Sequence, residues 1–500
     1  SISGRGKETR YQYDSLNRRT SVDRPDPLGR IEYLNRDGAG NVLRERRPNG
    51  NVVVRQWDAR NRLLRETDSL GLRKARAYDA NGNVTSKTDA RGTTIDLEYN
   101  AFNEVVRKEM PQHGEGQRIV TFEYDAQGNR RFRRVNDTLA PNMPTLAWET
   151  EYDLLNRPVR KHDPVNSNPK IITYDAEGNR ESVVDKRGLR TEYTHDALGR
   201  TVRVAKPQGH TITREYDPHG NLVREVDGRG IATEYAYDGL HRRIKTWRDG
   251  VLIDNRRFDA EGNLEWKEDA KGLRTEYEYY DANLVKAEIG EEAHVVEYTY
   301  FPSGERKTRE DPEGDLTRWE YDARNRKTAE INPEGERTDF RYDGNGNLTR
   351  KSLPRGNDWS YDYTLAGNIE RVTDPAGNTT DYRYDGRGNR LSATDGAGQK
   401  TEWRYDGLGR VEKKTYPDGS AHHFLSYDGN GNLTAERDPN GQRIEHDYDE
   451  LDRETERRYF TADGSLETKE VRTYDLNNNL KTVTETRQGR SWTTSFTYDD

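Results

Sequence analysis

The chain has 500 residues, of which 30% are hydrophobic and 34% are charged, so it cannot fill the thick apolar cores that several ordinary domains would need. Its 82 basic and 90 acidic residues nearly cancel to a net charge of -8, which disfavours a dedicated nucleic-acid binder, while its 30 Tyr and 8 Trp argue against disorder. The absence of Cys excludes disulfides, thiolate metal sites and cysteine nucleophiles, and no apolar run is long enough for a membrane-spanning helix or, within residues 1–10, for a signal peptide.

One repeating unit extends through the whole sequence. The unit begins with a Tyr-Asp pair, then has two variable residues, and then Gly-Asn, Gly-Arg or Asn-Arg. It returns about 23 times between Tyr13 and Tyr498, and most of the intervals between copies are 21 residues. We expect the residues of this motif to be structural repeat positions. In chain order the clearest of them are Tyr78, Asp79, Gly82, Asn83, Tyr174, Asp175, Gly178, Asn179, Tyr342, Asp343, Gly346, Asn347, Tyr384, Asp385, Gly388, Tyr405, Asp406 and Gly409.

A second turn follows each motif by about ten residues. It has Asp at its first position and Gly at its fourth, as in residues 68–71, 89–92, 269–272 and 374–377. An Asp side chain can accept hydrogen bonds from the backbone ahead of it, and Gly tolerates a positive φ. Each repeat therefore contains two turns and two short segments, and turns at this spacing predict antiparallel strands.

The segments between the turns have the period of a β-strand. Ile95, Leu97 and Tyr99 alternate with acidic residues, and the segment after Gly-Asn often begins with an aliphatic residue such as Val84 or Leu348. A period of two places the apolar groups on one face of a strand and the charges on the other. No helical period of comparable length competes with it. Alternation defines two faces but does not say which of them is internal.

These features predict an all-β fold, a long antiparallel β-hairpin ribbon that coils into a hollow spiral shell. Strands about 4.8 Å apart make the ribbon roughly 210 Å long, and a sheet of that length must coil because strands twist with a fixed hand. Too few apolar side chains are available to fill the space inside. A leucine-rich repeat lacks its L-x-x-L-x-L pattern here, a propeller would need about eleven blades, and a parallel β-helix would need stacked aliphatic residues.

The array is expected to be a single continuous one over residues 1–500, with about 22 repeats and two regions that break the phase. Longer loops are predicted in residues 100–150, where Met110, Met143 and residues 113–116 lie, and in residues 449–498. Such loops either extend the rim of the shell or offer a docking point for a partner, because long loops often carry function.

The repeat resembles the YD repeat of the Rhs family. Residues 377–391 match the family motif nearly throughout, with Gly377, Thr380, Tyr384, Asp385 and Gly388 at its positions. The resemblance covers essentially the whole chain and extends to wall-associated YD proteins, to the C component of insecticidal toxin complexes and to teneurins. It implies a spiral β-shell that, in bacterial members, encloses a toxic C-terminal domain of the same polypeptide.

The resemblance also implies partners and a location. We expect a bacterial protein that is made in the cytoplasm and exported by type VI or related machinery, with a spike protein and a chaperone bound through an N-terminal region that this sequence does not include. No toxin, spike-binding or core-cleavage domain is visible. The Asp-Pro-x-Gly strings at residues 26–29, 311–314 and 438–441 lie at ordinary repeat turns, so no cleavage role is assigned to them.

The residues give no sign of catalysis, and no catalytic, cofactor-binding or metal site is predicted. His422 and His423 are adjacent but would point to opposite faces of a strand. Residues 343–347 and 428–432 imitate the start of a calcium loop but lack its Gly and Glu, so turn chemistry explains them better. Residues 130–134, Arg-Arg-Phe-Arg-Arg, are either a phosphate or nucleic-acid patch or a solvated strand.

Two functions remain open on the sequence. The first is a non-enzymatic containment scaffold that encapsulates an effector until delivery. The second is a secreted or cell-surface adhesin or carbohydrate-binding module, in which rows of Tyr and Trp would stack on sugars. The rows of aromatic residues fit both functions, because aligned aromatic pairs also stabilise neighbouring strands.

Overall fold

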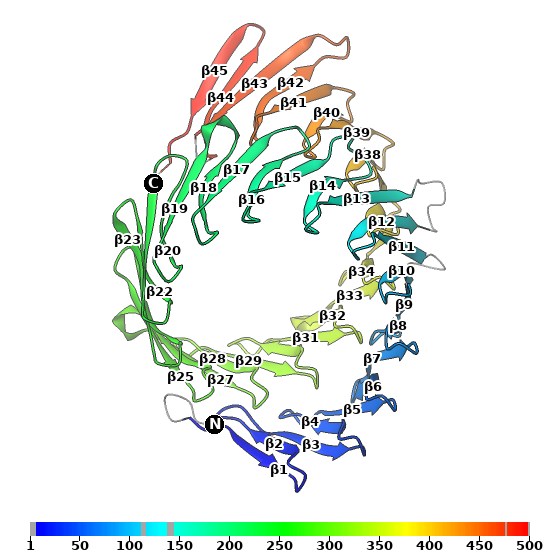
Figure 1. The fold of residues 1–500 in the computed structure, drawn as a ribbon, viewed down its shortest axis with the longest axis vertical. Coiled ribbons are helices and arrows are strands. Elements are labelled where there is room, and N and C mark those ends of the chain that lie inside the picture. The colour runs from blue at the N-terminus through cyan, green and yellow to red at the C-terminus, as the bar shows by residue number, and fades with distance from the viewer. Residues whose placement is uncertain (1–6, 112–116, 138–144, 476–477, 499–500) are drawn as a thin grey trace. The chain divides into compact units, whose positions relative to one another are not determined.

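The computed structural model describes residues 7–111, 117–475 without 138–144, and 478–498. In this part of the chain 45 β-strands and three short 3-10 turns account for the regular structure, and no α-helix is present (Figure 1). Nothing in the described residues is therefore a helix that could cross a membrane. The all-β prediction is confirmed.

The strands follow one another along the chain with short connections. Residues 7–111 form β1 (Arg10–Tyr13), β2 (Arg19–Asp23), β3 (Ile31–Arg36), β4 (Val42–Arg46), β5 (Val52–Trp57), β6 (Leu63–Asp68), β7 (Gly71–Tyr78), β8 (Val84–Thr88), β9 (Thr94–Tyr99) and β10 (Val105–Pro111). Residues 117–248 form β11 (Gln117–Tyr124), β12 (Arg130–Asp137), β13 (Leu146–Tyr152), β14 (Pro158–His162), β15 (Lys170–Tyr174), β16 (Arg180–Val184), β17 (Arg190–His195), β18 (Thr201–Ala205), β19 (Thr211–Tyr216), β20 (Leu222–Val226), β21 (Ala232–Tyr237) and β22 (Arg243–Arg248).

The second half of the chain repeats the arrangement. Residues 251–384 form β23 (Val251–Phe258), β24 (Leu264–Asp269), β25 (Arg274–Tyr279), β26 (Val285–Ile289), β27 (Val295–Tyr300), β28 (Arg306–Glu310), β29 (Leu316–Tyr321), β30 (Lys327–Ile331), β31 (Arg337–Tyr342), β32 (Leu348–Leu353), β33 (Asn357–Tyr363), β34 (Ile369–Thr373) and β35 (Thr379–Tyr384). Residues 390–495 form β36 (Arg390–Asp395), β37 (Lys400–Tyr405), β38 (Val411–Thr415), β39 (Ala421–Tyr427), β40 (Leu433–Arg437), β41 (Arg443–Tyr448), β42 (Glu454–Phe460), β43 (Leu466–Tyr474), β44 (Leu480–Arg487) and β45 (Arg490–Ser495). The 3-10 turns are η1 (Pro207–Gly209), η2 (Glu291–Ala293) and η3 (Pro354–Gly356).

The chain divides into two compact units, each built from two separate stretches. Unit 1 comprises Ser1–Gln117 and Ile253–Asp381, and unit 2 comprises Arg118–Leu252 and Tyr382–Asp500. We call the earlier stretch of each unit its first pass and the later stretch its second pass. Within a pass each strand pairs antiparallel with the next one along the chain, as β7 with β8 and β31 with β32. The predicted hairpin ribbon is therefore confirmed within each pass.

The Tyr-Asp hairpins at Tyr78, Tyr174 and Tyr405 carry the same irregularity. The register shifts by one residue just before the Tyr, so that Tyr78 lies opposite Val84, Tyr174 opposite Arg180 and Tyr405 opposite Val411. A bulge of this kind increases the local twist and re-aims the side chain beside it. The bulge therefore places each motif Tyr at the same point of its hairpin.

Nine of these tyrosines attach their hairpin to the one before it with a bond of the same span, which we call the tyrosine clip. Tyr78 donates its hydroxyl to the carbonyl of Leu63, 15 residues earlier, at 3.0 Å, and the Arg62 guanidinium lies 4.5 Å from the Tyr78 ring centroid. The same hydroxyl bond across 15 residues recurs at Tyr99, Tyr216, Tyr237, Tyr279, Tyr300, Tyr342, Tyr363 and Tyr405. The clip gives each repeat a polar and aromatic attachment that needs no thick core.

The apolar core is correspondingly thin. In the described residues the buried apolar side chains are mostly small: Val22, Val53, Val120, Val135, Leu146, Ile172, Val204, Ala287, Tyr298, Ala329 and Ala435. Large apolar side chains such as Leu154 and Phe102 are exposed at the tips of turns. Backbone ladders and tyrosine clips, rather than packed aliphatic layers, therefore hold the hairpins together.

The two regions that break the repeat phase differ. In residues 100–150 the predicted long connections, including Met143 and residues 113–116, fall on residues 112–116 and 138–144, which lie outside the described residues. In residues 449–498 the extra length lies in strands: β42, β43 and β44 have 7, 9 and 8 residues. The connection between β42 and β43 keeps the ordinary length, so the longer spacing there comes from longer strands rather than from longer loops.

Candidate functional site: the seam between two passes

The predicted repeat positions form one kind of turn. In each copy the Asp accepts a backbone N–H from the residue four positions on, and its second oxygen accepts the side chain of that same residue. For Asp79 and Asn83 the two distances are 2.8 and 2.9 Å, and for Asp406 and Arg410 they are 2.9 and 2.6 Å. The pairs Asp175–Asn179, Asp343–Asn347 and Asp385–Asn389 have the same bonds.

The glycine of the motif supplies the backbone conformation that closes this turn. Gly82, Gly178, Gly346, Gly388 and Gly409 all have a positive φ, between +82° and +99°. The Asp oxygens of residues 343 and 428, which imitate a calcium loop, are both used by their own turn. Turn chemistry therefore explains these residues.

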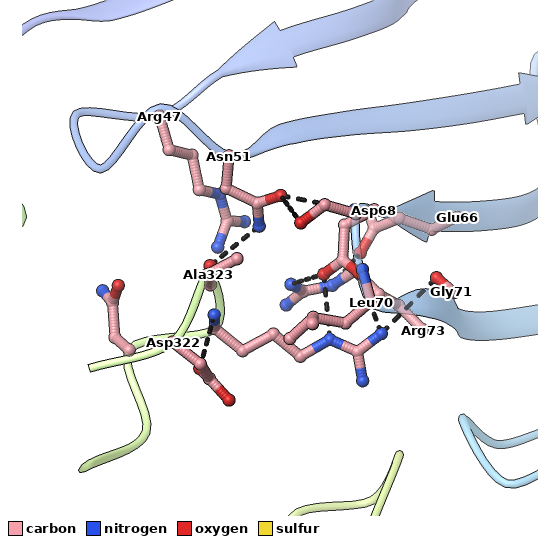
Figure 2. Close-up of polar contacts among 12 residues, drawn as sticks. Arg47, Asn51, Glu66, Asp68, Leu70, Gly71, Arg73, Asp322 and Ala323 are labelled. Carbon is pink, nitrogen blue, oxygen red and sulfur yellow. Dashed lines mark hydrogen bonds and ion pairs between the residues drawn. The ribbon is translucent and has the colours of Figure 1, made fainter. Parts of the chain in front are cut away.

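A fully buried carboxylate joins the two passes of unit 1. Asp68, at the end of β6, has a fully buried side chain, and Arg324 reaches it from the second pass with two parallel bonds of 2.9 Å (Figure 2). Arg73 adds a third bond at 2.9 Å and the backbone of Leu70 a fourth at 2.9 Å. Burial alone would raise the pKa of Asp68, but these donors, Arg324 first, outweigh it and hold the pKa far below its usual value.

Arg324 also donates hydrogen bonds to the backbone of both passes. Its guanidinium donates to the carbonyls of Leu72 at 3.0 Å and Gly344 at 2.7 Å. Only 9% of its side chain is exposed. A buried, bidentate pair of this kind fixes position strongly, because removing one partner leaves an uncompensated charge and costs about 3–5 kcal/mol.

A neutral contact lies beside this ion pair. Asn51, which is only 4% exposed, donates its side-chain amide to the carbonyl of Ala323 at 2.8 Å, and its oxygen accepts from the Ser69 hydroxyl at 3.1 Å (Figure 2). Asn49 reaches the same turn of the second pass through Asn325, at 2.7 Å. The second turns of the first pass thus face the Tyr-Asp turns of the second pass.

We call this line of contacts the seam, and one module of it occurs in both units. In unit 1 Asn345 donates to Asp89 at 2.7 Å, and Arg91 lies 3.5 Å from the Asp343 carboxylate while donating to the carbonyl of Thr364 at 2.7 Å. The first-pass partner is thus an Asp-x-Arg-Gly turn. The second-pass partner is the motif Tyr-Asp-Gly-Asn-Gly-Asn, followed by the next turn along the chain.

Unit 2 repeats the module with different residues. Asn430 donates to Asp185 at 2.7 Å, and Arg187 lies 3.6 Å from the Asp428 carboxylate while donating to the carbonyl of Asp449 at 2.9 Å. Arg91 and Arg187 are equally enclosed, with 14% and 15% of their side chains exposed. The agreement of bonds and distances indicates a recurring recognition module rather than chance contacts.

Glycine at the third motif position lets the passes approach. A Cβ on Gly344 would lie 2.3 Å from the carbonyl oxygen of Ala90, and one on Gly429 would lie 2.8 Å from that of Lys186. No ordinary Cβ contact is that short, so only Gly fits where the seam is tightest. Gly239, at the same motif position but away from the seam, has nothing within 4 Å.

A second polar cluster lies within unit 2, on strands β39 to β43. His446 is 6% exposed and lies between Glu454 at 2.5 Å and Glu436 at 3.4 Å, while His422 contacts Glu436 at 2.8 Å. Burial by itself would lower the pKa of His446, but the two glutamates outweigh it and raise the pKa. Burial by itself would raise the pKa of Glu454, but its hydrogen bonds with His446 and Arg457 outweigh burial and lower the pKa to about 2.

The other sequence candidates are bound within the fold. His422 stacks on Phe424 with ring centroids 4.5 Å apart, and no group of three or more potential ligands in the described residues is arranged to hold a metal ion. In the basic stretch on β12, Arg131 pairs with Glu149 at 3.1 Å and Arg133 lies 4.5 Å from the Trp148 ring centroid. Most of this stretch is thus engaged by neighbouring strands.

The sequence reasoning found the turns but missed the seam. It assigned Asp343 and Asn347 to one turn correctly, but it gave no role to Arg91, Arg187 or Arg324. Two signals were available: Gly instead of Ala at the third motif position, as at Gly344 and Gly429, and Arg at the third position of the second turn. Either signal by itself is weak. Together they indicate a contact between two passes only because the two turns, about 250 residues apart in the sequence, face each other in the fold.

Comparisons with known proteins agree with this fold. A family model described as RHS Repeat matches residues 36–73, 78–111, 174–211, 216–247, 302–337, 342–379, 365–400, 384–421 and 427–465, which is more than half of the chain. A comparison of the sequence with curated proteins found no significant match.

Solved structures share the fold at low sequence identity. The crystal structure of TcdB2-TccC3-TEV has a TM-score of 0.63 and 12% identity, and that of TcdB2-TccC3 without the hypervariable C-terminal region has a TM-score of 0.64 and 12% identity. The Photorhabdus luminescens Tc holotoxin pore with a mutated TccC3 has a TM-score of 0.62 and 12% identity. Each comparison covers 97% of this chain and 36% of the other, so this chain spans about a third of those proteins.

Proposed function

Because the chain belongs to the RHS repeat family, we propose that it is a wall segment of a hollow shell that encloses an effector domain of the same polypeptide until delivery. The wall itself is a non-catalytic scaffold in this proposal. The likeness to TcdB2-TccC3 over 97% of the chain supports a shell, although at 12% identity the likeness speaks for the fold alone.

The seam is the observation that carries the proposal. A ribbon of hairpins has little use for buried contacts between residues about 250 apart unless its passes must stay closed against each other. Asp68 and Arg324 make such a contact with fully or nearly buried charges. A wall that must exclude proteases and retain a chain needs its passes closed in this way, whereas a simple rod does not.

The composition supports containment rather than tight binding. With 34% charged residues and a net charge of -8, the wall offers a broadly polar surface that carries both positive and negative side chains. Such a surface is not suited to bind one ligand tightly. We propose that the protein is bacterial and exported, with delivery by type VI or related machinery and with a spike protein and a chaperone as further partners.

A carbohydrate-binding adhesin has less support. The hydroxyl of Tyr78 donates to a backbone carbonyl and a face of its ring is covered by Arg62, and the tyrosines of eight other repeats make the same hydroxyl bond. Rings committed in this way are not free to stack on sugars. No observation on the described residues favours the adhesin over the shell.

The test is an electron cryo-microscopy structure of the natural polypeptide that contains these residues, purified from producing cells, with protease protection measured in parallel. We expect non-repeat polypeptide inside the repeat wall, protected until the seam is opened by Arg324→Leu. A filled interior made only of repeat side chains, or an effector that proteases reach equally in the intact and the Arg324→Leu protein, would contradict the proposal.

A further inference from the structure

Two asparagines of the seam stand directly before a glycine. Three Tyr-Asp turns of the chain contain an Asn-Gly sequence, at Asn81, Asn345 and Asn430. Asn345 and Asn430 belong to the seam module of their unit, whereas Asn81 lies in a turn of the first pass of unit 1. Gly carries no side chain, so its backbone nitrogen can approach the side-chain amide of a preceding Asn with little obstruction. Asn-Gly is therefore a sequence at which an Asn amide is readily lost.

The loss of the amide balances with water alone. The glycine nitrogen attacks the Cγ of the Asn, a C–N bond forms, and the Cγ–Nδ2 bond breaks, so that the amide nitrogen leaves as ammonia with the proton of the glycine N–H. Water then opens the resulting cyclic imide at either carbonyl and leaves aspartate or isoaspartate. A side chain that donated hydrogen bonds thereby becomes a carboxylate, which only accepts them.

Each seam asparagine donates to one carboxylate oxygen across the seam. Asn345 donates to Oδ2 of Asp89 and Asn430 to Oδ2 of Asp185, both at 2.7 Å. The Oδ1 atoms of the two aspartates accept backbone N–H groups of their own turn, at 2.8 to 2.9 Å. Asn430 also donates to Asp452 at 3.0 Å. A carboxylate in place of either amide would face another carboxylate at hydrogen-bond distance, where like charges repel.

The closed turn protects these asparagines from the reaction. In all three turns the glycine N–H donates to the carbonyl of the turn's own Asp, at 3.1 to 3.2 Å, so its nitrogen is not free to attack until the turn opens. The side chain of Asn81 donates to a neutral oxygen, that of Asn103, at 3.3 Å. The turn of Asn81 therefore has the same closing bond as the seam turns but lacks their contact with a carboxylate of the other pass.

We propose that Asn345 and Asn430 are deamidation sites, and that the carboxylates formed there keep the seam open once its turns have separated. Because the ammonia is released, the change does not reverse, and each event disables one module of the seam. Unit 2 responds more strongly than unit 1, since Asn430 donates to Asp185 and Asp452 together.

The first experiment places the product of the reaction at the two sites. Amide hydrogen exchange of residues 87–92 and 184–189 is measured on the whole chain. Wild type is compared with Asn345→Asp/Asn430→Asp, with Asn345→Ala/Asn430→Ala, which removes the bonds without adding charge, and with Asn81→Asp as the matched control. We expect exchange about tenfold faster in the Asp double variant because of like-charge repulsion, a smaller acceleration in the Ala double variant, and none in Asn81→Asp.

The effect of the Asp double variant should also depend on pH. A neighbouring carboxylate raises the pKa of the added carboxyl group while the seam is closed. The closed seam is therefore favoured below about pH 4, where a protonated carboxyl can donate as the amide does, and is lost as the pH rises through the raised pKa. Exchange corrected for the intrinsic effect of pH should approach that of wild type at about pH 4.

The second experiment follows deamidation itself, by mass spectrometry of peptides from the whole chain after incubation at mildly alkaline pH. In wild type we expect Asn81 to deamidate faster than Asn345 and Asn430. Arg91→Gln/Arg187→Gln, which weakens the seam and leaves the Asn-Gly sequences unchanged, should raise the rates at both seam sites. The proposal is overturned if the Asp double variant exchanges no faster than the Ala double variant at neutral pH, or if the seam asparagines deamidate equally fast in wild type and in Arg91→Gln/Arg187→Gln.

Discussion

The two units use the same seam module but differ one repeat earlier along the seam. In unit 1 the buried Asp68 is neutralised across the seam by Arg324. In unit 2 the corresponding Asp163 is 7% exposed and pairs with Lys186 of its own pass. The second pass contributes Gly407 there instead, whose added Cβ would lie 2.9 Å from Leu146 and 3.1 Å from Val165.

The difference shows that the alignment of the turns across the seam and the strength of the contact between the passes are set by different residues. The module of Arg91 and Arg187 sets which turns face each other, with nearly identical distances in both units. The neighbouring contact then adds a buried ion pair in unit 1 and a close apolar approach in unit 2. We therefore expect substitution of the Asp68–Arg324 pair to open unit 1, and substitution of the corresponding Asp163 to leave the seam of unit 2 intact.

The largest effect is expected for Arg324→Leu, which places at this position the residue type that unit 2 has at Leu408. It leaves Asp68 buried with fewer donors, which costs about 3–5 kcal/mol of local stability. Hydrogen exchange of the amides in residues 316–331 measures this loss, because exchange reports the free energy of local opening.

Two further variants sharpen that result. Asp68→Asn/Arg324→Leu should recover much of the loss, because a buried ion pair replaced by neutral groups is often nearly neutral for stability. Asp163→Asn should perturb only its own turn and leave exchange in residues 400–415 unchanged. If Asp163→Asn instead released the second pass of unit 2, the distinction between the two seams would be wrong.

The next largest effect is expected for Gly344→Ala and Gly429→Ala, which test what the two units share. An added methyl group must displace the backbone of Ala90 or Lys186, and forced overpacking costs about 1–3 kcal/mol. Gly344→Ala should cost more, since its closest contact is 2.3 Å against 2.8 Å at Gly429.

Gly239→Ala is the matched control for these substitutions. It occupies the same motif position, and a Cβ there meets nothing within 4 Å, so its thermal unfolding should be close to that of wild type. Limited proteolysis should cut the seam turns of the Gly344→Ala and Gly429→Ala proteins only. Equal loss of stability in all three variants would mean that Gly is needed for the turn itself rather than for the seam.

The units should also differ in their response to pH. The raised pKa of His446 means that the charged imidazole stabilises unit 2 fully below pH 6.5, the ordinary histidine value, and that this stability is lost as pH rises through the folded pKa. Glu454, with a pKa lowered to about 2, contributes above pH 4.5 and loses its contribution only as pH falls toward 2. Asp68 likewise stays charged above pH 3.8, so the ion pair of unit 1 does not respond in this range.

Raising the pH from 6 to 9 should therefore loosen β41 and β42 of unit 2 by about 1.5 kcal/mol, the lower value for a hydrogen bond to a charged group. Exchange rates corrected for the intrinsic effect of pH measure it, with residues 63–78 of unit 1 as the internal reference. His446→Gln should abolish the difference between the two pH values. A dependence that persists in His446→Gln would assign it to another group.

Much of this architecture follows from local sequence, and the rest does not. Asp79, Gly82 and Asn83 predict their turn because all the partners lie within four residues of one another. Arg324 looks like any other charged turn residue, because its partner is Asp68, 256 residues away. Its role depends on how the passes are aligned, and a 21-residue period allows many alignments that differ by one whole repeat.

The smallest effect concerns a repeat of unit 2 in which the clip itself is altered. His195 stands where other repeats have Tyr, and a cleft of about 740 Å³ lined by Asp175, Tyr193 and Asp196 opens beside it. At nine anchors, Tyr78 and Tyr216 among them, the Tyr hydroxyl reaches the carbonyl 15 residues earlier, which for position 195 is that of Arg180. His195→Tyr should therefore restore the clip and stabilise the repeat by about 1 kcal/mol, the usual net value of one hydrogen bond. The measurement is thermal unfolding of His195→Tyr, compared with Tyr216→Phe, which removes the intact clip of the next repeat. We expect the two substitutions to change the stability in opposite directions. A destabilised His195→Tyr would show instead that the imidazole is needed beside Asp175, from which its Nδ1 lies 3.9 Å away.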